Sequence, residues 1–163
     1  MGMVLYLRRV EDVPALWEMV SDPDAFYDFL NEPDATEDLV DFDKAWQALH
    51  FVLSGSAWEG EGPLTFLLYA GKEISEDFGY GPTRLASPAE VRAFRDALAA
   101  LDDGELRRRY DPAAMAAEQI YLAETLADEG EAGWEYVTQS LPALRKLLDR
   151  SVETGSAIAI WVS

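Results

Sequence analysis

The amino-acid sequence predicts a single α+β domain, mostly helical, with a small sheet that includes the N-terminal and C-terminal strands. Alternating apolar segments predict those two strands, MVLYLR at residues 3–8 and SAIAIWV at residues 156–162. Between them, apolar residues recur mainly at helical spacing, and no repeat, linker or low-complexity tract divides the chain. A chain of 163 residues fits one domain, so we expect residues 1–163 to fold as one unit.

Near the N-terminus, two short helices and an acidic connector are expected. Asp12 can cap a helix that starts at Val13-Pro14, because proline suits a first helical turn. Ser21-Asp22-Pro23 restarts the chain into a second helix that directs Phe26, Phe29 and Leu30 inward. The acidic residues 31–41 then predict a connector.

The stretch DFDKAWQALHFVLSG, residues 41–55, predicts the central helix. Its apolar residues form one helical stripe and continue on other sides of the wheel, a pattern typical of a helix buried on more than one side. Gly55 is expected to end this helix, because glycine tolerates the left-handed cap conformation. The stripe consists of Phe42, Trp46, Leu49 and Leu53.

Beyond Gly55 the pattern is mostly helical. Residues 64–70 fit a short helix or a buried strand, and Pro63 and Gly71 at its ends favour the helix. The turn chemistry of GYGP predicts a strand over residues 83–86. Ser87 and Pro88 open a further helix. Three more helical segments are expected at residues 104–110, at residues 112–121 and at residues 134–152, the last interrupted or kinked near Pro142.

Composition excludes several chemistries. Without cysteine there can be no disulfide framework, thiolate zinc site or cysteine nucleophile, and a reducing cytoplasm is the natural location. The N-terminus places apolar residues before charged ones, the reverse of a signal peptide. No apolar run approaches the roughly 20 residues that cross a bilayer, so we expect no membrane association.

The charge is strongly acidic, with 31 Asp and Glu residues against 13 Lys and Arg residues. Twelve carboxylates and no Lys or Arg fall between Glu11 and Asp43. Nucleic-acid binding by phosphate neutralisation needs a basic face and is therefore not expected. The functional interpretation is a basic protein partner; the alternative is that the charge only keeps the protein soluble.

Several blocks of this chain resemble the YfbM-like family: the opening MGM, DKAWQALHFVLSG at residues 43–55, GYGPTRL at residues 79–85, and the pair Ile120-Tyr121. These are small bacterial proteins of unknown function with an α/β fold, and the similarity spans nearly the whole chain. Leu122 departs from the family pattern, which favours proline at this position. The resemblance therefore does not predict how the chain leaves the helix that ends near Tyr121. The resemblance implies one YfbM-like domain and a cytoplasmic location, but no catalytic residue, cofactor or substrate.

One histidine and no cysteine make a metal site of ordinary type improbable, and no phosphate-binding glycine motif occurs, so no metal or cofactor is expected. His50 and Ser54 are four residues apart and should be neighbours on one helix face. Without an orienting acid or a strained serine turn, we assign no catalytic residue. The candidate pocket residues are Trp46, His50, Ser54, Tyr80 and Arg84.

Two functional hypotheses follow. The first is a non-catalytic binding or regulatory protein that acts through its acidic surface, and one concrete version is an immunity-type inhibitor of a basic protein. In this case His50 is a buried polar tether inside the central helix. The second is a small hydrolase or ligand-binding enzyme with a pocket around His50, if the GYGP turn folds over the central helix. Oligomeric state is not predicted.

Overall fold

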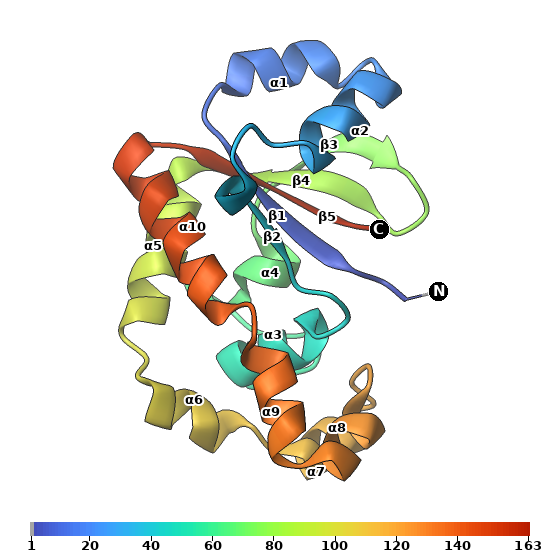
Figure 1. Cartoon of the computed structure of the whole chain (residues 1–163), viewed down its shortest axis with the longest axis vertical. Coiled ribbons are helices and arrows are strands. Elements are labelled where there is room, and N and C mark those ends of the chain that lie inside the picture. Colours follow the sequence, from blue (N-terminus) through green and yellow to red (C-terminus); the bar gives the residue numbers. More distant parts are fainter. Residues whose placement is uncertain (1) are drawn as a thin grey trace.

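A computed structural model describes residues 2–163 and contains a five-stranded sheet in the order β2-β1-β5-β4-β3 (Figure 1). All neighbouring strands are antiparallel. Strands β1 and β5, from the two ends of the chain, pair side by side, from Leu5 opposite Val162 to Val10 opposite Ala157. The predicted α+β class and terminal strands are confirmed. The strands are β1 Leu5–Val10, β2 Leu39–Asp41, β3 Lys72–Asp77, β4 Pro82–Ala86 and β5 Ala157–Val162.

Ten helices occur among residues 2–163. Helices α1 and α2 cover one face of the sheet, α5 and α10 pack together along one side, and α3 with α6 to α9 form the opposite end of the molecule (Figure 1). The helices are α1 Val13–Met19, α2 Pro23–Asn31, α3 Trp46–Ser54, α4 Phe66–Tyr69, α5 Pro88–Ala99, α6 Asp103–Arg109, α7 Pro112–Ala117, α8 Ala123–Glu129, α9 Glu131–Thr138 and α10 Leu141–Thr154.

The sheet separates two apolar cores, because successive strand side chains point to opposite faces. On one face, Leu7 and Ile160 join the large core formed with α3 to α10. On the other face, Trp161 joins a smaller core with Phe26 and Leu30 of α2. The predicted Asp12 cap of α1 is present, and Asp22 caps α2 in the same way, since both carboxylates accept hydrogen bonds from helix N–H groups. Helices α1 and α2 therefore pack on the sheet face opposite the one covered by the other helices.

The central helix α3 is buried on all sides, as its apolar pattern predicts, and Gly55 ends it with φ of +83°. It starts at Trp46 rather than Phe42, because Asp43 has φ of +48° and turns the chain before the helix. Phe42 nevertheless contributes to the large core. The one buried amide on α3, Gln47, accepts a hydrogen bond from the Tyr121 N–H at 2.9 Å.

The acidic connector contains more structure than the sequence predicts. A 3₁₀ turn at Thr36–Asp38 leads into the short edge strand β2. The opposite edge strand, β3, was also not predicted, because only Ile74 of its six residues is buried and its other side chains read as a polar loop. Residues 64–70 form a 3₁₀ turn and α4, so the helical alternative is confirmed.

The predicted helix over residues 112–121 is too long, since α7 ends at Ala117. The chain turns at Gln119 and Leu122, with φ values of +57° and +67°, and then enters α8, which was not predicted. Proline holds φ near −65° and could not adopt the Leu122 conformation. A proline at this position would therefore require a different backbone. The interruption near Pro142 is confirmed, because α9 and α10 are separate helices.

Tyr136 of α9 links that helix to the turn before α3, and its ionisation should be measurable. Its hydroxyl donates a hydrogen bond to the Asp43 carboxylate at 2.8 Å. Burial and the Asp43 charge raise the pKa of Tyr136 to about 12. In a spectrophotometric titration at 295 nm we expect one of the seven tyrosines to ionise near pH 12. The neutral tyrosine stabilises the fold below about pH 10, its unfolded pKa, and this contribution should be lost as pH rises toward 12.

The matched variant for this titration is Asp43→Asn, which keeps a hydrogen-bond acceptor and removes the charge. It should move the Tyr136 transition to lower pH. An unchanged transition in Asp43→Asn would mean that the Asp43 charge does not contribute to the raised pKa.

Candidate functional site

His50 lies inside the molecule, with 0% of its surface exposed. Its Nε2 atom is 3.1 Å from the Ser54 hydroxyl, and its ring meets Tyr69 of α4 edge-on at 6.2 Å between centroids. Nδ1 has no hydrogen-bond partner among residues 2–163. Burial lowers the pKa of His50, and the Glu59 backbone opposes this shift in part. The imidazole is therefore favoured in its neutral form.

The Ser54 hydroxyl is engaged by the loop after α3. It donates to the Ser56 carbonyl at 3.2 Å and accepts from the Ser56 N–H at 3.3 Å. The hydroxyl has one proton, so His50 Nε2 is the donor to Ser54 when that proton goes to Ser56, and the acceptor when it goes to His50. Only the second arrangement is that of a general base. In both arrangements the pair ties the end of α3 to the loop at Ser56.

Trp46 and Arg84 make structural hydrogen bonds with their polar groups. The Trp46 indole donates to the Met3 carbonyl at 2.9 Å, which attaches α3 to the N-terminal segment. The Arg84 guanidinium donates to the carbonyls of Leu67 and Ala70 at the end of α4. Burial lowers the pKa of Arg84, although two nearby glutamates oppose the shift. Both side chains stabilise elements that surround His50.

Tyr80 lies elsewhere, in the turn between β3 and β4, and is 46% exposed. It lines a hollow beside α2 and Trp161, on the sheet face that α1 and α2 cover. The structure thus brings His50 and Ser54 into contact on α3, places Arg84 against the neighbouring α4, and puts Tyr80 beside a different cavity.

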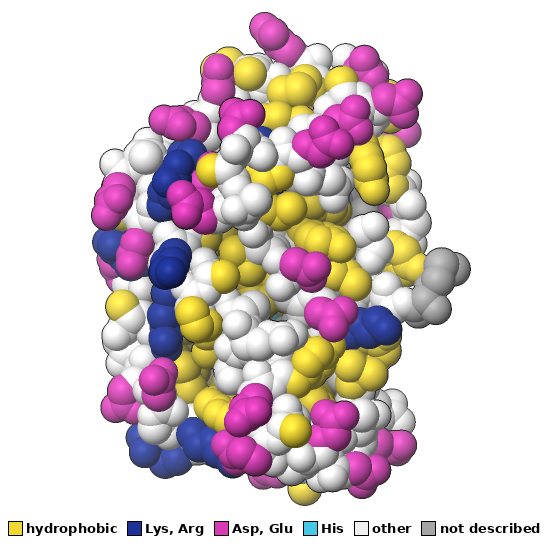
Figure 2. Space-filling view, viewed as in Figure 1, with side chains coloured by type: hydrophobic (Ala, Val, Ile, Leu, Met, Phe, Trp, Pro, Cys, Tyr) yellow, Lys and Arg dark blue, Asp and Glu magenta, His cyan; other side chains and the backbone are white. Residues whose placement is uncertain are grey.

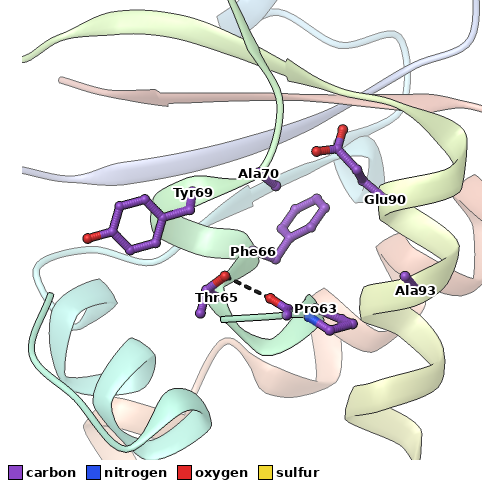
Figure 3. A pocket seen from close by; sticks show the side chains of 8 residues that line it. Pro63, Thr65, Phe66, Tyr69, Ala70, Glu90 and Ala93 are labelled. Atoms are coloured by element: carbon purple, nitrogen blue, oxygen red, sulfur yellow. Dashed lines mark hydrogen bonds between the residues drawn. The ribbon is translucent and has the colours of Figure 1, made fainter. Parts of the chain in front are cut away.

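A hollow of about 260 Å³ lies between α4 and α5 (Figure 3). Two of its polar side chains already have partners: the Thr65 hydroxyl donates to the Gly62 carbonyl, and the Glu90 carboxylate accepts from the N–H groups of Gly71 and Ser87. Burial opposes these two backbone donors, but together they lower the pKa of Glu90. Glu90 therefore serves the cap of α5 and the turn at Gly71.

A second hollow, of about 370 Å³, is here named the aromatic hollow. It is formed by residues of α2, the β3–β4 turn and the end of β5, and Asp24 is the charged residue among those that line it. Sequence patterns indicate only Tyr80, because the rings of the hollow come from three segments far apart in the chain: α2, the β3–β4 turn and β5. Its five aromatic residues are Phe26, Tyr27, Phe78, Tyr80 and Trp161.

The acidic segment from Glu11 to Asp43 includes α2, which lines the aromatic hollow. Ten of its twelve carboxylate residues are exposed; Asp43 is half-buried and Asp38 is buried. Figure 2 shows acidic side chains interspersed with exposed apolar ones over α1 and α2, at the top of the view, and Lys and Arg mainly along the left side and the lower left. The ten exposed residues are named the acidic face: Glu11, Asp12, Glu18, Asp22, Asp24, Asp28, Glu32, Asp34, Glu37 and Asp41.

Among residues 2–163, every helix is too short or too polar to span a bilayer. Over the same residues, no group of three or more His, Asp or Glu side chains is arranged to hold a metal ion.

The fold and these sites define a small α+β domain with a buried histidine at its centre and an acidic, aromatic surface around α2. The chain belongs to the family described as domain of unknown function DUF1877, whose model matches residues 1–161. Its fold is similar to the crystal structure of YfbM from Escherichia coli, a protein of unknown function, with 22% sequence identity and a TM-score of 0.71. The match covers 98% of this chain and 99% of that one. No curated protein is similar to this chain.

Proposed function

We propose that this protein is a non-catalytic binding or regulatory protein of the cytoplasm that takes a basic protein partner on its acidic face. The observation that carries the proposal is the exposure of ten carboxylates between Glu11 and Asp41, a segment without Lys or Arg. Such a field attracts a basic protein over a Debye length, about 8 Å at physiological salt, and speeds association. One concrete version is an immunity-type inhibitor that neutralises a basic protein.

Exposed apolar residues on and beside α1 and α2 support binding rather than solubility alone. Trp17, Tyr27, Phe78 and Tyr80 are four of the six large apolar side chains that are exposed among residues 2–163. They lie around α1, α2 and the β3–β4 turn. Large exposed aromatic residues next to charged ones are typical of interaction sites, whereas a solubility surface needs only the charges.

The second candidate is a small hydrolase or ligand-binding enzyme with a pocket around His50. The observation in its favour is the buried Nδ1 atom without a hydrogen-bond partner among residues 2–163, next to a Ser54 contact of 3.1 Å. The burial of His50 argues against it, since 0% of the surface of this residue is exposed to a substrate. Binding through the acidic face is therefore the stronger proposal.

Neutralising part of the acidic face tests the proposal. We expect a variant carrying Glu18→Gln, Asp28→Asn, Glu32→Gln and Asp34→Asn to lose most of the basic protein that the wild type retains from a cell extract at low salt. None of these four carboxylates caps a helix or makes an ion pair within 4.0 Å. Retention by the wild type should disappear at about 0.5 M salt, where screening is strong.

The matched control removes the same amount of charge from α8 and α9, with substitutions to amides at Glu124, Asp128, Glu129 and Glu135, which are also exposed. This control should retain the partner. Equal loss in both variants would show that only net charge matters. If the wild type retains no basic protein at any salt concentration, the acidic face is a solubility device.

A further inference from the structure

We propose that the aromatic hollow binds an arginine side chain of the basic partner. This inference rests on the proposed function and names the site that recognises the partner. It commits to one occupant because the hollow offers aromatic rings and one carboxylate, the two groups that bind a guanidinium best.

The aromatic hollow has the size and lining of a site for one side chain. Its volume of about 370 Å³ lies within the 300–1,000 Å³ of small-ligand sites. Tyr27 and Phe78 are 60% and 61% exposed, so their surfaces are accessible to a partner. No Lys or Arg is among the residues that line the hollow, and Asp24 supplies a negative charge. A cation can enter without displacing one that is already present.

The walls of the hollow are held in place before any ligand arrives. Trp161 stacks on Tyr6 at 5.3 Å between ring centroids, with 17° between the planes. In the β3–β4 turn, the Asp77 carboxylate accepts hydrogen bonds from the N–H groups of Gly79 and Gly81, at 2.7 and 2.9 Å. These bonds lower the pKa of Asp77, and they fix the turn that presents Phe78 and Tyr80.

The chain already binds a guanidinium on α2 in the same manner. Arg8 of β1 lies over the Phe29 ring at 4.1 Å from its centroid, and its Nε atom donates to the Phe29 carbonyl at 2.7 Å. A flat guanidinium can stack on a ring and direct its N–H groups sideways to an acceptor, whereas an ammonium is a compact, strongly hydrated charge. The aromatic hollow repeats this combination with rings and the Asp24 carboxylate, which favours arginine over lysine.

Two peptides of equal charge test this inference. One alternates glycine with arginine and the other alternates glycine with lysine, and both are titrated into the full-length protein at low salt, followed by NMR shifts of backbone amides. We expect the arginine peptide to bind about five- to tenfold more tightly, as an extra cation–π contact would give. Phe78→Leu, Tyr80→Leu and Asp24→Asn should each remove most of that preference.

The matched control is Tyr69→Leu, since Tyr69 is equally exposed, at 54%, but lies on α4 beside His50. It should leave both affinities unchanged. Equal, salt-sensitive binding of the two peptides would show that the aromatic hollow does not recognise arginine, and it would leave the proposed function intact. Binding of neither peptide would also overturn it, while the extract experiment separately decides the proposed function. If the single amino-acid derivative N-acetyl-arginine methylamide binds as tightly as the peptide, the occupant is a small molecule and the partner assignment is wrong.

Discussion

Replacing Asp38 with alanine is expected to lower the free energy of unfolding by about 3–5 kcal/mol, the cost of leaving a buried charge without its partner. Asp38 lies in the 3₁₀ turn before β2, and its two oxygens accept hydrogen bonds from Arg9 at 2.7 and 3.0 Å. Both side chains are only 8% exposed. The substitution would leave the Arg9 guanidinium buried with fewer acceptors.

The Arg9–Asp38 pair belongs to a cluster that joins distant segments of the chain. Arg9 also donates to the hydroxyls of Thr154 and Ser156, at 3.3 and 3.1 Å, where α10 leads into β5. Arg150 of α10 places its Nε atom 3.0 Å from an Asp38 oxygen. Loss of the Asp38 carboxylate therefore affects β1, the acidic connector and α10 together, which is why the expected effect is large.

Urea denaturation at pH 7 measures this effect, and Glu37→Gln is the matched control. Glu37 is next in the chain and pairs with Arg150 at 3.1 Å, but it is 66% exposed. An exposed pair contributes about 0–1 kcal/mol, so the control should lose little. Similar losses in Asp38→Ala and Glu37→Gln would contradict a stabilising role for the buried cluster.

The same cluster predicts a dependence of stability on pH. The hydrogen bond from Arg9, with the charges of Arg9 and Arg150, outweighs burial and lowers the pKa of Asp38. The ionised carboxylate therefore stabilises the fold above its unfolded pKa of about 3.9. This contribution should be lost as pH falls through the lower pKa of the folded state. Asp38→Asn should weaken the loss of stability on acidification.

The parts of the fold that could be predicted are those with a local signal. The two terminal strands are short apolar segments that contribute side chains to the cores on both faces of the sheet. Helix α3 is apolar on all sides. Both patterns are visible within a few consecutive residues. Edge strands β2 and β3 lack such a pattern, because they bury little surface. The turn at Gln119 and Leu122 depends on a tertiary contact, the hydrogen bond from Tyr121 to Gln47, which no local pattern indicates.

The candidate sites divide in the same way. The contact between His50 and Ser54 follows from their four-residue spacing on a helix. The aromatic hollow does not follow from the sequence, because Tyr27, Tyr80 and Trp161 meet only when α2, a hairpin turn and the last strand pack together. Nor could twelve similar carboxylates reveal that Asp38 alone would be buried against Arg9.

His50→Ala is expected to cost roughly 2–4 kcal/mol of unfolding free energy, because it leaves a cavity at a fully buried position and removes the partner of Ser54. Thermal or urea denaturation measures this loss. His50→Asn, which fills part of the space and retains polar atoms, should recover a portion of it. A variant as stable as the wild type would contradict the interpretation of His50 as a structural tether.

The pH dependence of stability separates a buried neutral histidine from an exposed one. Burial lowers the pKa of His50 in the folded state, whereas the unfolded chain binds a proton near pH 6.5. The unfolded state therefore holds more protons below that pH, and stability should fall as pH decreases from about 6.5 toward the lower folded pKa. Comparing wild type with His50→Asn between pH 7.5 and 5 isolates this contribution, since other groups are common to both.

An assay for hydrolysis completes the distinction between the two functional hypotheses. If the Ser54 proton is directed to Ser56 and His50 is the donor, then neither wild type nor His50→Asn should cleave activated esters faster than buffer. Cleavage by the wild type that His50→Asn abolishes without unfolding would require the reverse proton arrangement. The two roles of His50 are therefore distinguished by two measurements. Loss of a structural tether lowers the free energy of unfolding, whereas loss of a catalytic base lowers only the rate of hydrolysis.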